Sequence, residues 1–277
     1  MTKIIDELPV LFTCFAYRQE YVAELDVMLP TIRKHHPDWP IVAGRGPIDG
    51  YELPTLEVES PAGKLHHLSL PVPLNLDGGL DDWRKITRMK AWWIGEVWHK
   101  FAGLVGPWRR VLWIDADARL LGPLDIELES EAEVIAGPYY VDPDDPDDYM
   151  MESGLLFFQG AEGGRVEGII DEWSSLSVSQ ITNLPPLNPR WPDSDQDVLR
   201  RVMRDYTDTE GYTLVKLEQE KYNAMPDPEV GTPIPGALVD QWVLSFKMRY
   251  PEDRDKQWPP PEEARRPAPA ATASEAE

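Results

Sequence analysis

An apolar stretch that runs directly into two aspartates constrains the fold of this chain more than any other feature. Residues 111–114 read VLWI and are followed by Asp115, Ala116 and Asp117. Carboxylates are costly to bury without partners, so neither aspartate is expected to pack in a core by itself. The stretch therefore predicts a buried strand whose end reaches either a solvated turn or a positively charged ligand.

The start of the chain predicts the sheet to which this strand belongs. Residues 9–16 are typical of a strand, residues 17–36 carry apolar positions at helical spacing, and residues 40–46 are typical of a second strand. A β-α-β order favours an α/β fold with a mixed, mostly parallel central sheet flanked by helices. Ligands of such sheets bind beyond the carboxyl ends of the strands, which is where the aspartate pair is expected.

The periodicity of the remaining chain predicts further strands and helices. The helix over residues 81–103 has one apolar stripe, and Lys85 and Arg88 are expected on its exposed face. The acidic stretch 141–150 is expected to be a solvated loop. Strands are expected at 110–114, 133–140, 154–160 and 212–219, and helices at 164–176 and 192–206.

Composition and charge limit the classes of partner. The 277 residues include 27 Lys and Arg against 49 Asp and Glu, for a net charge of −22. Such a field disfavours nucleic acid and anionic membranes as general partners but leaves room for a divalent cation. No apolar run reaches the ~20 residues of a membrane-spanning helix. The single cysteine, Cys14, excludes an intramolecular disulfide and favours a cytoplasmic location.

The chain divides by composition into one domain and a tail. Residues 1–250 carry the periodic segments and are expected to form a single domain. Residues 251–277 are rich in Pro, Ala and charge without periodicity, and they are expected to be disordered.

The strand that ends in Asp115-Ala116-Asp117 resembles the metal and nucleotide-sugar site of GT-A-fold glycosyltransferases. Two later segments follow in the order of that superfamily. Residues 152–160 (ESGLLFFQG) resemble the strand after the acceptor loop, and residues 194–203 (SDQDVLRRVM) resemble the D-Q-D segment of family 8 glycosyltransferases, which retain the donor configuration. The resemblance implies a GT-A-like, Rossmann-related fold and a metal-dependent transfer of a sugar from a nucleotide-diphosphate donor, most often a UDP-sugar, to a hydroxyl acceptor.

The resemblance also implies roles for individual residues. Asp115 and Asp117 would hold Mn²⁺ or Mg²⁺, because such ions take oxygen ligands and keep positions open for a diphosphate. Asp195 and Gln196 would lie beside the anomeric carbon of the donor, with Asp195 as a stabilising carboxylate or a base. Thr13, Cys14, Phe15 and Tyr17 would hold the nucleoside, Lys85 and Arg88 the phosphates or the sugar, Ala116 the donor, and Gly154 would let the chain pass close to the sugar.

One departure from family 8 concerns the third metal ligand. Family 8 enzymes use a histidine late in the chain, whereas all five histidines here precede Asp115. Residues 236–249 occupy the corresponding place, so Asp240 or Gln241 could supply an oxygen instead. The alternative is that Asp240 is an ordinary surface residue, just as Lys85 and Arg88 could form a solvated helix face.

Two other functions remain open on the sequence. A nucleotidyltransferase of the same fold is disfavoured, because the chain opens without a glycine-rich, lysine-bearing phosphate loop. A non-catalytic nucleotide-sugar-binding protein is favoured by the missing histidine. It is disfavoured by the presence of the Asp115 and Asp117 pair and of Asp195-Gln196. The net charge of −22 favours a saccharide, glycoconjugate or small-molecule acceptor over a modified nucleic-acid base.

Overall fold

The computed structural model of the chain describes residues 1–47, 55–74, 76, 80–142, 145–186, 194–207, 211–225 and 234–241. The expected tail at 251–277 and the expected end of the domain near residue 250 lie outside the described residues.

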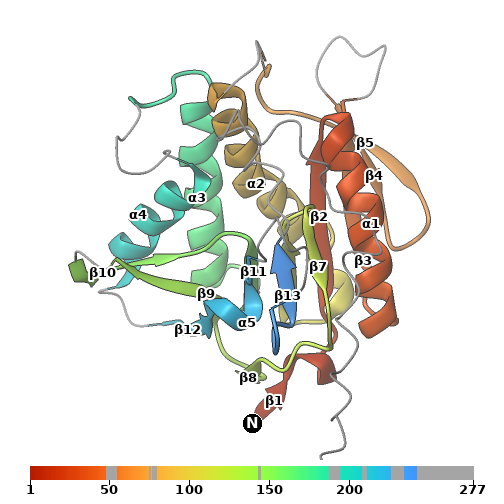
Figure 1. Cartoon of the computed structure of the whole chain (residues 1–277), viewed down its shortest axis with the longest axis vertical. Coiled ribbons are helices and arrows are strands. Elements are labelled where there is room, and N and C mark those ends of the chain that lie inside the picture. The colour runs from red at the N-terminus through yellow and green to blue at the C-terminus, as the bar shows by residue number, and fades with distance from the viewer. Residues whose placement is uncertain are drawn as a thin grey trace, which may run out of the picture.

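The described residues form one large mixed sheet at the centre of the molecule (Figure 1). Its strands run in the order β10-β9-β11-β6-β2-β3-β4-β5, with β12 beside β9. The parallel pairings are those of β2 with β3 and β6 and of β12 with β9, and the remaining pairings are antiparallel. The strands are β2 (Leu11–Tyr17), β3 (Ile41–Gly46), β4 (Thr55–Glu59), β5 (Leu65–Ser69), β6 (Arg109–Ile114), β9 (Val134–Asp142), β10 (Asp145–Met151), β11 (Leu155–Gly160) and β12 (Thr213–Glu218).

Helices cover this sheet and bury its central strands. Helix α1 packs against β2 and β3, whereas α2 and α3 pack against each other and against the sheet, and α4 lies against both of them (Figure 1). Every residue of β2, β6 and β11 is buried as a result. The helices are α1 (Gln19–His35), α2 (Leu80–Lys100), α3 (Arg165–Ile181), α4 (Asp195–Thr207) and α5 (Gln219–Tyr222), with 3-10 turns at Ile5–Glu7 and Ala102–Val105. The expected mixed α/β class is confirmed.

The acidic stretch 141–150 differs from the expected loop. Strand β9 continues to Asp142, and β10 returns antiparallel to it, with Tyr149 opposite Val141 and Met151 opposite Tyr139. Strand pairing uses main-chain groups, and β10 is the last strand at its end of the sheet order. Edge strands accommodate charged residues, so an acidic sequence does not prevent this pairing.

A second, short sheet brings distant parts of the chain to the end of β6. Strand β7 (Ala118–Leu120) follows the aspartates and pairs antiparallel with β13 (Val239–Gln241), so that Gln241 lies opposite Ala118. On its other side β13 bonds to Ala224, whose N–H donates to Val239 and whose carbonyl accepts from Gln241. A further two-stranded sheet pairs β1 (Thr2–Ile4) with β8 (Glu127–Glu129).

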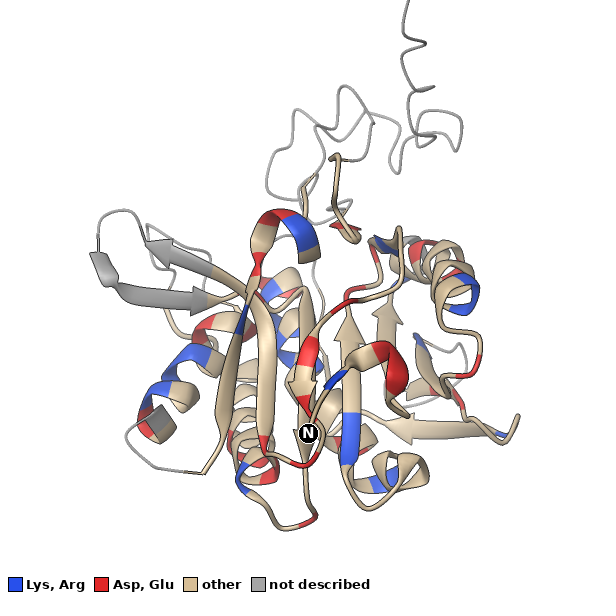
Figure 2. Ribbon diagram, turned by 90° about the horizontal axis from the view of Figure 1, so that it is seen from below, with Lys and Arg blue, Asp and Glu red and all other residues tan. Residues whose placement is uncertain are grey.

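The charged residues of the described chain are not sorted by sign. Figure 2 shows lysine and arginine interspersed with aspartate and glutamate over the helices. Within the part of the chain that the structure describes, no helix has the length and apolar character that crossing a membrane requires.

Arg18 has a backbone conformation that suits glycine. Its φ is 91° and its ψ is 146°, at the junction of β2 and α1. Its N–H donates to Gly46 O at 2.7 Å, and its carbonyl accepts from Tyr21 and Val22 in the first turn of α1. These bonds hold the residue in a region where a side chain costs about 1–3 kcal/mol.

We expect Arg18→Gly to raise the free energy of unfolding by about 1 kcal/mol, because relief of this strain exceeds the added flexibility of glycine in the unfolded chain. Urea denaturation measures the change. Arg18→Ala is the matched control, since it removes the same side chain but keeps the strained Cβ, and it should not stabilise. Equal stability of the two variants would contradict the account.

Candidate functional site

The aspartate pair lies where the central strands end. Asp115 follows β6, and its N–H donates to Gly154 O, just before β11, at 2.8 Å. The Ala118 N–H donates to Asp115 O at 3.0 Å, which closes a turn over residues 115–118. Because β2 and β6 are parallel, this turn lies at their carboxyl ends, as the sequence predicts.

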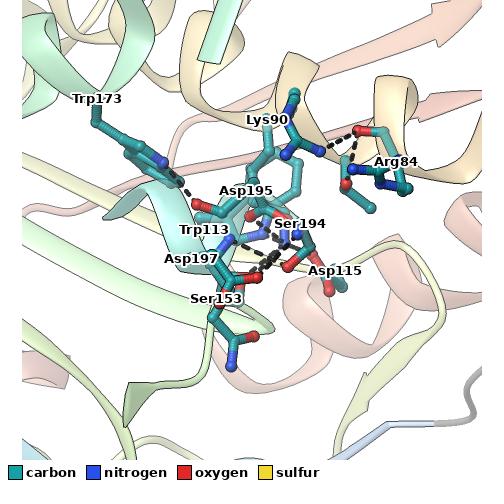
Figure 3. Close-up of polar contacts among 12 residues, drawn as sticks. Arg84, Lys90, Trp113, Asp115, Ser153, Trp173, Ser194, Asp195 and Asp197 are labelled. Carbon is teal, nitrogen blue, oxygen red and sulfur yellow. Dashed lines mark hydrogen bonds and ion pairs between the residues drawn. The ribbon is translucent and has the colours of Figure 1, made fainter. Parts of the chain in front are cut away.

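The ammonium group of Lys90 is the centre of the site. Lys90 lies in α2 and is 5% exposed. Its Nζ lies 2.8 Å from Asp115 Oδ1 and 3.4 Å from Asp195 Oδ2, and it donates to the carbonyl and the hydroxyl of Ser153 at 3.0 Å each (Figure 3). These four residues are called the Lys90 network below.

The charges of this network depend on each other. Burial raises the pKa of Asp115 above its ordinary value, Lys90 opposes this rise, and Asp117 and Asp195 add to it. Burial by itself would lower the pKa of Lys90, but Asp115 and Asp195 raise it above its ordinary value. Lys90 therefore stays charged, because it is the cation that permits buried carboxylates at this place.

Asp115 accepts hydrogen bonds at both carboxylate oxygens. Trp113 Nε1 donates to Oδ1 at 2.8 Å, beside the ammonium of Lys90. Gln241 Nε2 donates to Oδ2 at 3.2 Å. These donors fix the orientation of the carboxylate, and the contact with Gln241 joins the site to β13.

The D-Q-D segment begins α4 and holds one carboxylate inside the site. Asp195 is 2% exposed, and its carbonyl accepts from Trp173 Nε1 at 3.0 Å (Figure 3). Asp197 Oδ2 accepts from Ser194 N at 3.0 Å, and Ser194 Oγ accepts from Gln196 N at 3.3 Å. Asp195 thus faces Lys90, whereas Asp197 serves the start of the helix.

A further carboxyl group at the site, that of Glu152, contacts Gln196. The side chains of Gln196 and Glu152 are hydrogen-bonded, and burial raises the pKa of Glu152, with Lys90 opposing and Asp115 and Asp195 adding to the rise. Glu152 precedes the Ser153 that binds Lys90. Three carboxyl groups, those of Asp115, Asp195 and Glu152, thus lie around the ammonium of Lys90.

The structure brings Gln241, and not Asp240, to the carboxylate of Asp115. Successive side chains of a strand point to opposite faces, so the contact of Gln241 with Asp115 directs Asp240 away from it. Asp240 is buried and lies opposite Arg119 in the pairing of β13 with β7. Of the two candidate residues of the late segment, Gln241 is the one that contacts Asp115, and Asp240 is buried and is not the surface residue of the alternative.

The predicted nucleoside contacts at the end of β2 need correction. Thr13 is fully buried, and its hydroxyl donates to Val42 O and accepts from Trp93 Nε1, both at 2.8 Å. Phe15 packs against the same Trp93. Thr13 and Phe15 thus point towards α2, and the alternation of the strand turns the buried Cys14 towards the other face. These side chains are held in the core and are not presented to a nucleoside. Tyr17, also buried, ends the strand.

The predicted exposed face of α2 is also wrong. Arg88 is fully buried, with Nε donating to Gln180 Oε1 and Nη1 to Arg84 O, each at 3.1 Å. Helix α3 covers this side of α2, so Arg88 serves helix packing and not an exposed phosphate. Lys85 is half-buried, and Asp117 and Ala116 lie buried in the turn after β6.

Four side chains of the candidate site, those of Lys90, Glu152, Ser153 and Asn223, were not predicted from the sequence. The burial of Lys90 could have been predicted from its neighbours, because residues 88–94 (RMKAWWI) are mostly apolar and indicate a buried part of the helix. Glu152 and Ser153 lie inside the ESG segment already singled out. No local sequence pattern predicts that Asn223 lies at the site. Its position there follows from the pairing of the next residue, Ala224, with β13.

A divalent metal ion at this site would need ligands from the substrate as well as from the protein. In the described residues, no three His, Cys, Asp or Glu side chains are grouped to hold a metal by themselves. Mg²⁺ and related ions are commonly bound by one or two carboxylates together with substrate phosphates, which requires no such group. Asp115 and Asp117 offer the carboxylates for a site of this kind.

Comparison with known proteins supports the fold. No protein-family model and no curated protein matches the chain. Among solved structures, the chain is similar to one described as the "crystal structure of a glycosyltransferase involved in the glycosylation of the major capsid of PBCV-1". The identity is 11% and the TM-score 0.50, over 88% of this chain and 99% of that one. At this identity the likeness shows the fold, which is the expected GT-A-like arrangement.

Proposed function

We propose that this protein is a glycosyltransferase that moves a sugar from a nucleotide-diphosphate donor, a UDP-sugar, to a hydroxyl acceptor, with Mn²⁺ or Mg²⁺ and with retention of configuration. The observation that carries the proposal is the Lys90 network. It places a buried ammonium between Asp115 and Asp195 at the carboxyl ends of the central strands. The solved glycosyltransferase of similar fold supports the same class of reaction.

The charges of the site suit the departure of a nucleoside diphosphate. As the bond to the anomeric carbon breaks, negative charge develops on the leaving phosphate, and a fixed positive charge stabilises it. A divalent ion held by Asp115 and Asp117 would supply such a charge when bound. Lys90 holds Asp115 in one orientation, and its ammonium adds positive potential beside the same carboxylate.

The opposite charge develops on the sugar. A departing leaving group makes the anomeric carbon oxocarbenium-like, and a nearby carboxylate stabilises that state. Asp195 is suited to this role, because its carboxylate is buried, lies 3.4 Å from the ammonium of Lys90 and is fixed at the first residue of α4. Gln196 and Glu152 form the next pair of polar groups at this place.

The products formed by the purified protein test this proposal. Incubation with UDP-glucose, UDP-galactose or UDP-N-acetylglucosamine and Mn²⁺ should release UDP, slowly with water as acceptor and faster with a true acceptor. Release of pyrophosphate from UTP and a sugar 1-phosphate would instead identify a nucleotidyltransferase. Binding of a UDP-sugar without release, in the presence of a panel of acceptors, would favour the non-catalytic binding protein.

A further inference from the structure

The amide of Asn223 lies beside the Lys90 network, although no step of the proposed reaction has used it. Asn223 follows α5 and is 2% exposed. Its N–H donates to Gln219 O at 2.8 Å, and the next residue, Ala224, is bonded to both Val239 and Gln241 of β13. Figure 1 shows α5 beside β13. The main chain on both sides of Asn223 is therefore fixed.

Two amide side chains, those of Asn223 and Gln241, converge on Gly154. A Cβ placed on Gly154 would lie 2.9 Å from Asn223 Oδ1 and 2.8 Å from Gln241 Oε1. The absence of a side chain at Gly154 is what lets both amides approach the backbone this closely. Gly154 itself accepts from Asp115 N, and Gln241 donates to Asp115 Oδ2, so both amides belong to the surroundings of Asp115.

The amide nitrogen of Asn223 is not used within the part of the chain that the structure describes. Among the described residues, Nδ2 of Asn223 has no hydrogen-bond partner, although the atom is buried. A buried donor without a partner costs about 1–3 kcal/mol. Buried polar groups in folded proteins are paired in the great majority of cases, so an unpaired one at a binding site points to a partner that arrives with the ligand.

The chemistry of the two amides selects the kind of group that they would bind. Asn223 offers a donor at Nδ2, and the carbonyl oxygens of Asn223 and Gln241 lie beside it as acceptors. Phosphate and carboxylate oxygens only accept, and an ammonium only donates, whereas a hydroxyl does both. The pair therefore matches a hydroxyl group. A nucleotide sugar carries hydroxyls on its ribose and on the transferred sugar, and the place of Asn223 beside Gly154 and the Lys90 network, where the anomeric carbon is proposed to lie, favours the transferred sugar.

We infer that Asn223 binds a hydroxyl of the transferred sugar through Nδ2 and thereby determines which sugar the protein accepts. This inference rests on the proposed function, since it assigns a specificity-determining residue to the donor site. A site built to bond a hydroxyl discriminates against an analogue that lacks it, because the polar group of the protein is then left unpaired.

Calorimetric titration with UDP and with UDP-glucose, UDP-galactose and UDP-N-acetylglucosamine, all with Mn²⁺, tests the inference. Asn223→Ala should bind UDP with unchanged affinity and should bind the preferred UDP-sugar about tenfold more weakly, as expected for one lost hydrogen bond. Asn183→Ala is the matched control, since Asn183 is exposed just beyond the end of α3, and it should change neither affinity.

Monodeoxy analogues of the preferred UDP-sugar separate recognition from a merely structural effect. One analogue should lose about tenfold in affinity for the wild-type protein and lose nothing further on Asn223→Ala, because both changes remove the same bond. Additive losses for every analogue, or equal losses for UDP and UDP-sugar, would overturn the inference. If Asn223→Ala does not fold, Asn223→Ser takes its place in the same cycle. A wild-type protein that binds neither UDP nor any UDP-sugar would overturn the proposed function itself.

Discussion

Replacing Lys90 by methionine is expected to lower the free energy of unfolding by about 3 kcal/mol, because removal of one partner leaves buried charge without compensation. Lys90 is buried within α2, and its ammonium is the cation placed 2.8 Å from Asp115 and 3.4 Å from Asp195. Methionine fills a similar volume, so the loss reports the charge and its hydrogen bonds to Ser153 and not a cavity.

Urea denaturation at neutral pH measures this loss. The matched control is Lys100→Met at the exposed end of the same helix, which should change stability by less than about 0.5 kcal/mol. In the double variant Lys90→Met/Asp195→Asn, one uncompensated carboxylate is gone, so the total loss should be smaller than the sum of the two single losses. A loss for Lys90→Met no larger than that of the control would contradict the buried network.

Asp195→Asn is expected to slow UDP release about a thousandfold while UDP-sugar affinity stays within a fewfold range, since the carboxylate acts mainly on charge that develops in the transition state. Asparagine keeps the shape of the side chain, and the carbonyl of residue 195 remains available to Trp173 Nε1. The rate constant and the donor affinity are measured separately, by a UDP-release assay at saturating donor and by calorimetry.

Asp205→Asn provides the control for this substitution, because Asp205 lies on the same helix and is exposed. Its rate constant should equal that of the wild type. An Asp195→Asn protein that releases UDP at the wild-type rate would remove Asp195 from the reaction. An equal loss in donor affinity would assign it to donor binding alone.

The parts of the site that sequence predicts are those with a local signal. The change from VLWI to Asp115 is abrupt within a few residues, and it correctly predicts a buried strand that ends in acidic residues. The first β-α-β unit and the helix that begins at Asp195 follow from periodicity in the same way. Both strand and helix patterns are local properties of the chain, and they predict most of the described elements.

The remaining parts depend on packing between distant segments. Arg88 is buried because α3 lies over α2, and α3 begins more than sixty residues later in the chain. Lys90 is buried on another side of α2, against Ser153, which lies 63 positions later. Gln241 reaches Asp115 across 126 positions of sequence, through the pairing of β13 with β7. No local pattern marks such contacts, and the alternation of β13 then decides between Asp240 and Gln241.

A thermal-shift screen of UDP-sugars, with and without Mn²⁺, tests the central claim most directly. A ligand that binds only the folded protein raises its apparent stability by mass action, by about 2.7 kcal/mol at a hundredfold excess over the dissociation constant. We expect a Mn²⁺-dependent rise in melting temperature with a UDP-sugar for the wild-type protein and no such rise for Asp117→Ala. A folded wild-type protein that shows no rise with any nucleotide sugar, or an equal rise in Asp117→Ala, would contradict the central claim.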